Sequence, residues 1–180
     1  MTTRHLVLIG LMGAGKSTVG ERCASALGRS FVDTDRIVEL NAGMTVAEIF
    51  STQGEPAFRA LERIVVADVS LSPEPLVIAC GGGVALDPDN RRALRDHGVV
   101  VWLRADAQEL GRRVGSGAGR PLLENGLGGA GAAPAATLER LALLRAPAYE
   151  AAAHAIVDTD GLPIEAVTQL VLEEYRTWNA

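Results

Sequence analysis

The stretch 10-GLMGAGKST-18 decides the fold, and the apolar run 5-HLVLI-9 comes directly before it. It matches the pattern G-x-x-x-x-G-K-[ST], in which glycines let backbone amides turn around phosphate oxygens at the start of a helix. The apolar run predicts a buried strand, and 16-KSTVGERCASALG-28 predicts the helix, which Gly28 ends. Because it lies between a strand and a helix, the motif predicts a site for a nucleoside triphosphate rather than a glycine turn without a ligand.

The residue types of this loop suit the chemistry of a bound nucleotide. The Lys16 ammonium would reach the β- and γ-phosphates, and the Ser17 hydroxyl would ligate Mg²⁺. Lys16 is the only lysine in the chain, so the N-K-x-D motif with which GTPases read their base is absent. The residues of the loop that we expect to bind ATP are Gly13, Ala14, Gly15, Lys16, Ser17 and Thr18.

The composition is that of an ordinary globular protein, with 48% hydrophobic and 22% charged residues in a chain of 180. This length predicts one domain over residues 1–180. The net charge of −5 argues against a nucleic-acid partner and favours a monomer. No apolar segment is long enough to span a membrane and no signal peptide is recognisable, so we expect a cytoplasmic protein without a membrane partner. Cys23 and Cys80 are too few for a disulfide framework and are expected to be buried.

Short apolar runs alternate with helical patterns along the whole chain. Strands that are apolar throughout, separated by helices, indicate an α/β fold with a parallel sheet covered on both faces. The size of the chain fits a small-molecule or nucleotide kinase better than an ATPase motor. After 5–9, strands are predicted at 31–35, 76–80, 99–103 and 155–158. After 16–28, helices are predicted up to Leu40, over 46–50 with Thr45 as N-cap, from Pro56 to about Val69, and over 88–98, 107–114, 137–152 and 163–178.

The acids expected near Mg²⁺ are not where proteins with this loop usually carry them. The run 76-LVIACGGGVAL-86 has no acid, and the only predicted strand that ends in acids is 31-FVDTD-35. Side chains alternate along an extended segment, so Asp33 and Asp35 are expected on the same side of it. They would lie at the edge where open α/β sheets bind ligands, one facing Mg²⁺ through water and the other an acceptor hydroxyl. The alternative is that Asp35 only caps the next helix.

Gly81, Gly82 and Gly83 are expected to form a wall of the acceptor site. Glycine lets the backbone approach a ligand closely and leaves N–H groups free to bind it, and we expect Gly82 to make direct contact. The alternative is a tight turn that needs positive φ, for which one or two glycines would be enough.

The segment 115-GSGAGRPLLENGLGGAGAAPAA-136 is rich in glycine and alanine. It could be a disordered surface loop, but long loops inside compact domains are often functional lids. Arg120, before Pro121, favours a lid over about 113–136 that brings a cation to a bound ligand.

Six motifs together resemble those of shikimate kinases, in order and over nearly the whole chain. They are GLMGAGKST, FVDTD, GEPAFR (54–59), CGGGV, RPLL (120–123) and RAPAYE (145–150). The resemblance implies a P-loop fold like that of the nucleoside monophosphate kinases, with a five-stranded parallel sheet in order 2-3-1-4-5 and a mobile lid. It implies ATP-dependent phosphorylation of the 3-hydroxyl of shikimate with Mg²⁺, a step of chorismate and aromatic amino-acid biosynthesis.

The resemblance also implies roles for individual residues. Asp33 would lie near Mg²⁺, and Asp35 would bind the shikimate hydroxyls and orient or deprotonate the nucleophile. Arg59 and Arg145 would clasp the carboxylate of shikimate, which a planar guanidinium suits. The region that binds this substrate would span about residues 33–62.

Two further arginines carry over to the nucleotide side of the site. Arg120 would close over the transferring phosphate and stabilise its charge, and Arg113 would lie near the adenine. With Lys16 and Asp35, Arg120 completes the expected catalytic set. Ala148 stands where the family often has Leu, a loss of apolar bulk beside Arg145.

Some alternatives stay open at the level of sequence. Arg59 and Arg145 could each be a solvated helix residue, and Glu62 could either orient Arg59 or form only a surface pair with it. Rival functions with the same core are a gluconate kinase, a nucleoside monophosphate kinase and a P-loop protein that binds nucleotide only as a partner switch.

Overall fold

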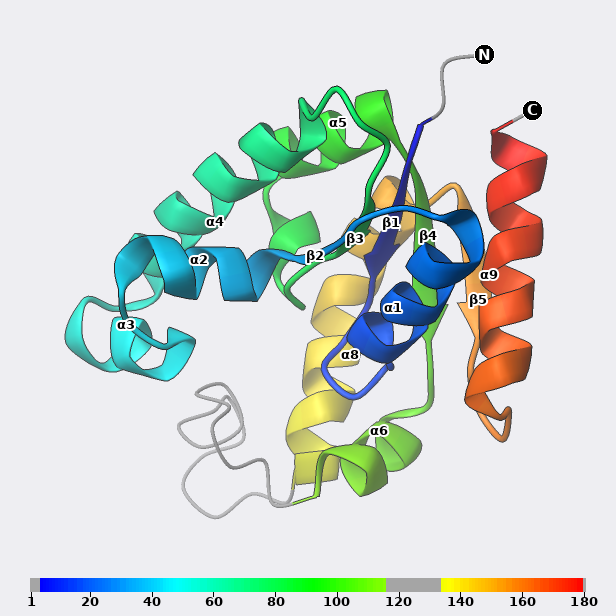
Figure 1. Ribbon diagram of the computed structural model, residues 1–180. Coiled ribbons are helices and arrows are strands. Elements are labelled where there is room, and N and C mark those ends of the chain that lie inside the picture. The colour runs from blue at the N-terminus through cyan, green and yellow to red at the C-terminus, as the bar shows by residue number, and fades with distance from the viewer. Residues whose placement is uncertain (1–3, 116–133, 180) are drawn as a thin grey trace.

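The computed structural model describes residues 4–115 and 134–179 and contains a five-stranded parallel sheet (Figure 1). Its strands are β1 (His5–Ile9), β2 (Phe31–Asp33), β3 (Val77–Ala79), β4 (Gly98–Arg104) and β5 (Ala155–Asp158). They lie in the order β2-β3-β1-β4-β5, which confirms the predicted 2-3-1-4-5 order. At the centre Val7 pairs with Ile78 on one side and with Val100 on the other.

The burial of each strand follows from its place in the sheet. All residues of β1 and β3 are buried, as are those of β4 up to Leu103, because helices cover both faces there. The edge strand β5 alternates between buried and exposed residues. The uninterrupted apolar runs of the sequence therefore predicted the central strands, and the alternating run marks the edge.

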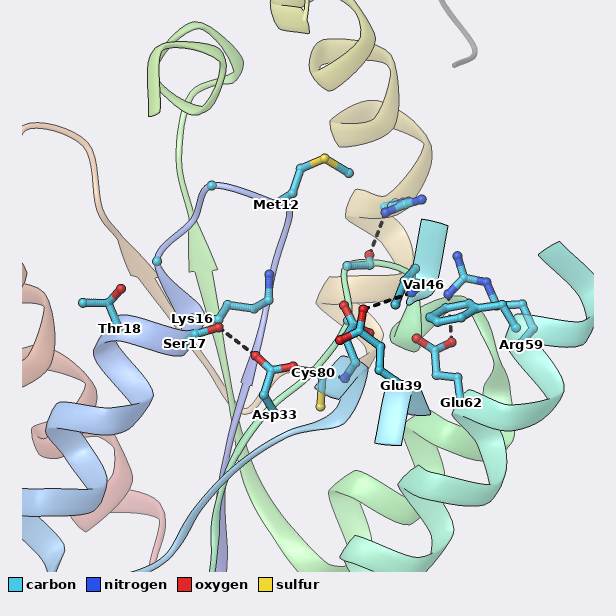
Figure 2. A pocket seen from close by; sticks show the side chains of 18 of the residues that line it. Met12, Lys16, Ser17, Thr18, Asp33, Glu39, Val46, Arg59, Glu62 and Cys80 are labelled. Carbon is cyan, nitrogen blue, oxygen red and sulfur yellow. Dashed lines mark hydrogen bonds and ion pairs between the residues drawn. The ribbon is translucent and has the colours of Figure 1, made fainter. Parts of the chain in front are cut away.

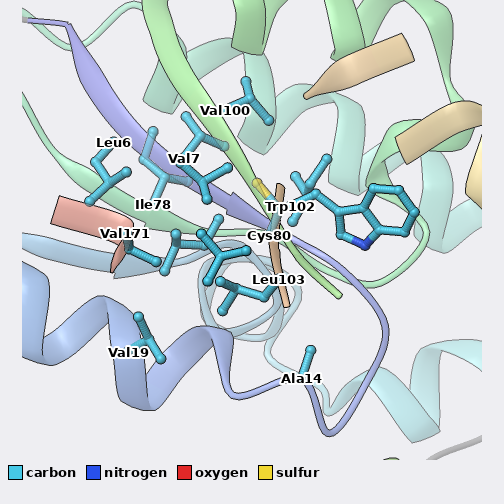
Figure 3. Close-up of a cluster of buried hydrophobic side chains, with 14 of the residues drawn as sticks. Leu6, Val7, Ala14, Val19, Ile78, Cys80, Val100, Trp102, Leu103 and Val171 are labelled. Carbon is cyan, nitrogen blue, oxygen red and sulfur yellow. The ribbon is translucent and has the colours of Figure 1, made fainter. Parts of the chain in front are cut away.

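Helices cover both faces of the sheet, and those nearest the two chain ends lie on the same face (Figure 1). One face carries α1 packed against α9, and the opposite face carries α5 packed against α8. On the first face Val19 and Val171 pack near the central strands, together with Leu103 (Figure 3). The helices are α1 (Lys16–Leu27), α2 (Thr34–Ala42), α3 (Val46–Thr52), α4 (Glu55–Ser70), α5 (Pro88–His97), α6 (Ala107–Val114), α8 (Pro134–Ala152) and α9 (Ile164–Trp178), with a 3-10 turn η1 (Val84–Leu86).

A second, smaller core lies outside the sheet, among α2, α3 and α4. Val38, Ile49, Phe58 and Val65 are buried in it and are separate from the main cluster. This core holds together the part of the chain that was expected to bind the acceptor. This region therefore has a hydrophobic core of its own beside the sheet.

The predicted boundary at 31-FVDTD-35 is wrong. The strand ends at Asp33 and α2 begins at Thr34, so Asp35 lies in the first turn of a helix and not two positions after Asp33 on the same side of a strand. Asp33, not Asp35, is the N-cap, since its Oδ1 accepts from the Asp35 amide at 3.1 Å. A carboxylate that bonds to a nearby amide favours the start of a helix over further strand.

The other boundaries differ by a few residues or agree. As expected, Gly28 ends α1, in the left-handed region at φ 64°, and Thr45 is the N-cap of α3; the structure adds a capping box between Thr45 and Glu48. Strand β3 ends at Ala79, while α2 continues to Ala42 and α8 begins at Pro134. Cys23 and Cys80 are both buried, as predicted, and no helix in the described ranges is long and apolar enough to cross a membrane.

Candidate active site

A cavity of about 610 Å³ opens at the carboxyl ends of β1, β2 and β3 (Figure 2). Figure 2 shows Lys16, Ser17 and Asp33 on one side of it and Arg59 and Glu62 on the other. The predicted site residues that line it are Gly13, Gly15, Lys16, Ser17, Thr18, Asp33, Asp35, Arg59, Gly81, Gly82, Gly83, Arg113 and Arg145. Residues far apart in the sequence are thus brought to one place.

Of the predicted residues that the structure describes, Ala14 is not part of this lining. Ala14 is 2% exposed and its side chain belongs to the main core, although its amide lies in the phosphate loop. Arg120 lies outside the described residues, as does most of the expected lid.

The phosphate loop places the start of α1 at the cavity. Gly15 is the N-cap of α1 in the left-handed region, at φ 90°, and Gly13 has φ 83°. Only glycine adopts these angles without strain. The first amides of α1, with their partial positive charge, therefore face the space where phosphate oxygens would bind.

The side chains of Lys16 and Ser17 are held by neighbouring oxygen atoms. Lys16 Nζ donates to the carbonyl oxygens of Gly10 at 2.9 Å and Leu11 at 3.0 Å. Ser17 Oγ donates to Asp33 Oδ2 at 2.8 Å. The strand β2 therefore delivers a carboxylate to the first turn of α1.

The pair formed by Ser17 and Asp33 fits a Mg²⁺ ion. A hydroxyl and a carboxylate meet there, and Mg²⁺ prefers oxygen ligands while taking the rest of its shell from water and phosphates. Within residues 4–115 and 134–179, no group of three or more His, Cys, Asp or Glu side chains could hold a metal ion alone.

Asp35 lines the same cavity as Asp33. Its Oδ1 is buried and has no hydrogen-bond partner among the described residues. Burial, and then the nearby carboxylates of Asp33 and Glu62, raise the pKa of Asp35 to about 6, while Lys16 and Arg59 oppose the shift. A carboxylate in this setting can accept a proton near neutral pH.

Arg59 is held by carboxylates from its own helix. Its Nη1 lies 2.8 Å from Glu62 Oε2, and its Nη2 lies 2.9 Å from Glu55 Oε1. The Glu62 side chain is only 1% exposed, so the pair is not a surface pair, and the orienting interpretation is confirmed. Burial raises the pKa of Glu62, and the charge of Arg59 opposes that shift.

Arg145 approaches the cavity from α8. It is 4% exposed, and its Nη1 donates to the carbonyl oxygen of Gly82 at 2.8 Å. It is therefore not a solvated helix residue. Arg59 and Arg145 line the same cavity and form a pair of guanidinium groups that could bind one anion bidentately.

The three glycines are needed for close approach and not for their backbone angles. None of them has positive φ, so the alternative of a tight turn that needs it is wrong. A Cβ on Gly81 would lie 2.5 Å from Asp35 Oδ1, and one on Gly82 would lie 3.3 Å from Arg145 Nη1. A Cβ on Gly83 would overlap the guanidinium of Arg59. The end of β3 can therefore lie directly against the acid and both arginines.

One part of the expectation for these glycines is wrong. Their amides were expected to be free for the acceptor, but the Gly81 amide donates to Thr34 Oγ1 at 3.1 Å. Thr34 begins α2, so this hydrogen bond ties the glycine segment to the helix that carries Asp35.

Arg113 ties α6 to the loop that follows β5. Its Nε donates to Glu109 Oε1 at 2.8 Å, while Nη1 and Nη2 donate to the hydroxyl and carbonyl oxygens of Thr159 at 3.0 and 2.9 Å. Arg113 also lines the cavity, and its contact with adenine stays a prediction.

Sequence reasoning did not assign a role to several residues of the lining. Glu62 was noticed through its i,i+3 spacing from Arg59, and only its burial shows what it does. The others, which also line the cavity, carry no motif. Val46 and Phe58 are apolar residues of helices and read as core, and Cys80 belongs to an apolar strand run. Met12 is a variable position of the phosphate loop, and Glu39 reads as a surface helix residue.

The arrangement of charges indicates one kind of chemistry. A loop for phosphates, a pair of oxygen ligands for Mg²⁺, a central carboxylate and two arginines lie in sequence around one cavity. Such a set can hold a nucleoside triphosphate at one end and a small anion at the other. The carboxylate between them could receive the proton of an attacking hydroxyl.

Comparison with known proteins gives consistent results. A protein-family model described as shikimate kinase matches residues 12–176. The shikimate kinase of Symbiobacterium thermophilum is 45% identical over 174 residues, which are 96% of this chain and 96% of that protein. The shikimate kinase of Nitrobacter winogradskyi is 46% identical over 157 residues, 87% of this chain and 70% of that protein.

Solved structures extend the likeness to three dimensions. Shikimate kinase from Acinetobacter baumannii in complex with shikimate superposes with a TM-score of 0.89 at 34% identity, covering 98% of this chain and 94% of that one. A gluconokinase from Sinorhizobium meliloti has a TM-score of 0.58 at 22% identity, covering 99% of this chain and 94% of that one, and shares the fold.

Proposed function

The chain belongs to the shikimate kinase family, and from this premise we propose that it transfers the γ-phosphoryl group of ATP to the 3-hydroxyl of shikimate. The product, shikimate 3-phosphate, leads to chorismate and the aromatic amino acids. The observation that carries the proposal is the single cavity that joins Lys16 and the phosphate loop to the paired arginines through Asp35.

The nucleotide binds at the phosphate loop. The amides at the start of α1 donate hydrogen bonds to phosphate oxygens. Lys16 gives up its hydrogen bonds to the Gly10 and Leu11 carbonyl oxygens and donates instead to the β- and γ-phosphates. Both oxygen atoms are uncharged acceptors, so a phosphate competes with them effectively.

Mg²⁺ is the cofactor that this nucleotide brings. Ser17 and Asp33 are the side chains that would hold it, and when bound it neutralises charge on the β- and γ-phosphate oxygens. Ser17 and Asp33 already lie together, so little rearrangement of either side chain is needed.

Shikimate binds at the other end of the cavity. Arg59 and Arg145 hold its carboxylate, and the glycine segment lies against its ring. Asp35 accepts a hydrogen bond from the 3-hydroxyl and receives its proton as that oxygen bonds to the γ-phosphorus and ADP leaves. With a pKa of about 6, Asp35 is ionised at neutral pH and can accept this proton.

Closure of the site is assigned to the segment of about 113–136. We expect Arg120 to stabilise charge on the transferring phosphoryl group and Arg113 to lie near the adenine. Exclusion of water by the lid would favour transfer to shikimate over hydrolysis of ATP.

The chain is expected to act as one kinase domain. The substrate-binding region spans about residues 33–62 and coincides with α2, α3 and the start of α4, which share the smaller core. We expect a cytoplasmic monomer with ATP and shikimate as its partners, and its net charge of −5 disfavours nucleic acid.

An assay of ADP release tests the function. The protein is supplied with MgATP and, in separate reactions, with shikimate, gluconate and nucleoside monophosphates. The expected result is rapid ADP release in the reaction with shikimate and not in those with gluconate or nucleoside monophosphates. Preference for gluconate would make it a gluconate kinase, and absence of turnover with every acceptor would favour a nucleotide-binding switch.

A further inference from the structure

The carbonyl oxygen of Gly82 is the point at which two side chains of α8 converge. It accepts a hydrogen bond from Arg145 Nη1 at 2.8 Å and another from the hydroxyl of Tyr149. Arg145 and Tyr149 are four residues apart, so they lie on the same face of α8. A carbonyl oxygen has two lone pairs and can satisfy both donors at once.

We propose that Tyr149 is a positioning residue for the carboxylate of the acceptor, acting through the Gly82 carbonyl and Arg145. The inference rests on the proposed function and adds a residue that touches neither substrate. Tyr149 is 1% exposed and is not among the described residues that line the cavity. Its hydroxyl acts through the atoms that it holds.

The first effect concerns the backbone of the glycine segment. Three consecutive glycines have no side chains to hold them and lose much conformational freedom on folding. The peptide unit between Gly82 and Gly83 is planar, so a donor that fixes its carbonyl also fixes its N–H. Two hydrogen bonds from α8 therefore set the orientation of the segment that forms a wall of the cavity.

The second effect concerns Arg145. Its Nη1 is anchored on the same oxygen, so the position of Gly82 determines where the rest of the guanidinium points. A guanidinium has five N–H donors in a rigid fork, and a small rotation misaligns a bidentate contact. Loss of the Tyr149 hydroxyl would let Gly82 and Arg145 move together.

The surroundings of Tyr149 keep it a donor. Its ring packs against Trp102 of β4, with centroids 5.3 Å apart, and burial raises the pKa of its hydroxyl to about 12. The ring is therefore placed by the sheet, independently of the hydroxyl. Replacement by phenylalanine keeps this packing and removes only the hydrogen bond.

Tyr175 provides a matched control. It is 2% exposed, and its hydroxyl donates to the Arg4 carbonyl oxygen at 2.7 Å and accepts from Arg29 Nη1 at 2.6 Å. Arg4 precedes β1 and so lies at the amino ends of the parallel strands, whereas the cavity opens at their carboxyl ends. Tyr175→Phe thus removes a buried tyrosine hydroxyl, with its hydrogen bonds to Arg4 and from Arg29, without touching the site.

The test compares shikimate with its methyl ester, which keeps the hydroxyls and lacks the charged carboxylate. In Tyr149→Phe we expect the KM for shikimate to rise about fivefold to tenfold, which corresponds to the loss of one hydrogen bond. The KM for the ester and for ATP should change less than twofold, and kcat should stay near that of the wild type. In Tyr175→Phe the thermal midpoint should fall while the preference for shikimate over the ester is unchanged.

Wild-type turnover of shikimate is measured first, since its absence would contradict the proposed function itself. If the wild type is active, three results would overturn the inference alone. They are an unchanged preference in Tyr149→Phe, an equal rise in KM for both acceptors, and failure of Tyr149→Phe to fold while Tyr175→Phe folds. The last result would make the hydroxyl structural.

Discussion

Gly83 lies against the guanidinium of Arg59, and a methyl group in place of its hydrogen would overlap that guanidinium. Its backbone angles, φ −103° and ψ −4°, are accessible to alanine, so the substitution strains the contact and not the main chain. At this scale, the absence of one carbon atom decides where a charged group can lie.

Gly83→Ala is expected to displace Arg59. The KM for shikimate should rise roughly tenfold to a hundredfold, the range for a hydrogen bond to a charged group, and the KM for ATP should stay unchanged. Gly82→Ala is the comparison, because its Cβ would lie 3.3 Å from Arg145 Nη1 and needs only a small shift. It should impair acceptor binding less than Gly83→Ala and ATP binding hardly at all. A larger effect from Gly82→Ala would contradict this assignment of contacts.

Glu62→Gln is expected to release Arg59 from its buried partner. Removing the charge of a buried carboxylate while the arginine remains should lower the free energy of unfolding by about 1–3 kcal/mol. The KM for shikimate should rise severalfold, because the guanidinium is no longer held in one orientation. Urea unfolding and steady-state kinetics measure the two effects.

Glu55→Gln is the matched control for Glu62→Gln. Both carboxylates contact Arg59, but the side chain of Glu55 is 48% exposed and that of Glu62 is 1% exposed. An exposed pair contributes at most about 1 kcal/mol, so Glu55→Gln should have little effect on stability or KM. Equal effects of the two variants would show that burial of Glu62 is unimportant.

At the scale of elements, His154 joins the start of β5 to β4. Its Nδ1 accepts from the Val100 amide at 3.0 Å, and its own amide donates to the Val100 carbonyl at 2.8 Å. Acceptance at Nδ1 requires the neutral ring. Burial, with the charges of Arg95 and Arg4, lowers the pKa of His154 to about 4.

Acid is therefore expected to weaken this junction. The pKa is about 6.5 in the unfolded chain and about 4 in the folded one, so between these values only the unfolded state takes up the proton. The stabilisation is complete above pH 6.5 and is lost as the pH falls toward 4. Urea unfolding at pH 7.5 and 5.0 should show His154→Gln less stable than the wild type at the higher pH, with a smaller difference at the lower one. A difference that grows in acid would contradict this sign.

The elements show why sequence patterns predicted some boundaries and not others. The central strands are apolar throughout because both faces are buried, and Gly28 and Thr45 act within one turn of their own helix. The end of β2 depends on whether the Asp33 carboxylate bonds to the Asp35 amide or points away along a strand. Both outcomes fit FVDTD, so the local pattern was ambiguous.

At the scale of the whole molecule, ATP and the acceptor are expected to bind at opposite ends of one cavity and to stabilise the fold separately. A ligand at a hundred times its Kd adds about 2.7 kcal/mol, or roughly 5–10 °C in thermal midpoint for a domain of this size. Lys16→Ala should lose turnover and the shift caused by MgATP while keeping the shift caused by shikimate. Arg59→Lys should lose the shift caused by shikimate while keeping the shift caused by MgATP, and it should raise the KM for shikimate strongly.

Thermal unfolding with each ligand alone measures these shifts. The unliganded midpoints of both variants should stay close to that of the wild type, which serves as the control for folding. Turnover by Lys16→Ala would contradict the role of the phosphate loop, and equal losses for both ligands in Arg59→Lys would contradict its assignment to the acceptor.

The sequence by itself determined the alternation of strands and helices, the phosphate loop and the residue types that gather around it. These follow from local patterns, since a glycine loop between a strand and a helix binds phosphate through neighbouring amides. The tertiary structure alone decided that Glu62 is buried beneath Arg59, that Gly83 makes room for that guanidinium, and that Tyr149 and Arg145 converge on Gly82. These contacts join α4 and α8 to the end of β3 across long stretches of chain. Their geometry depends on how the helices pack on the sheet, so a local sequence pattern does not predict it.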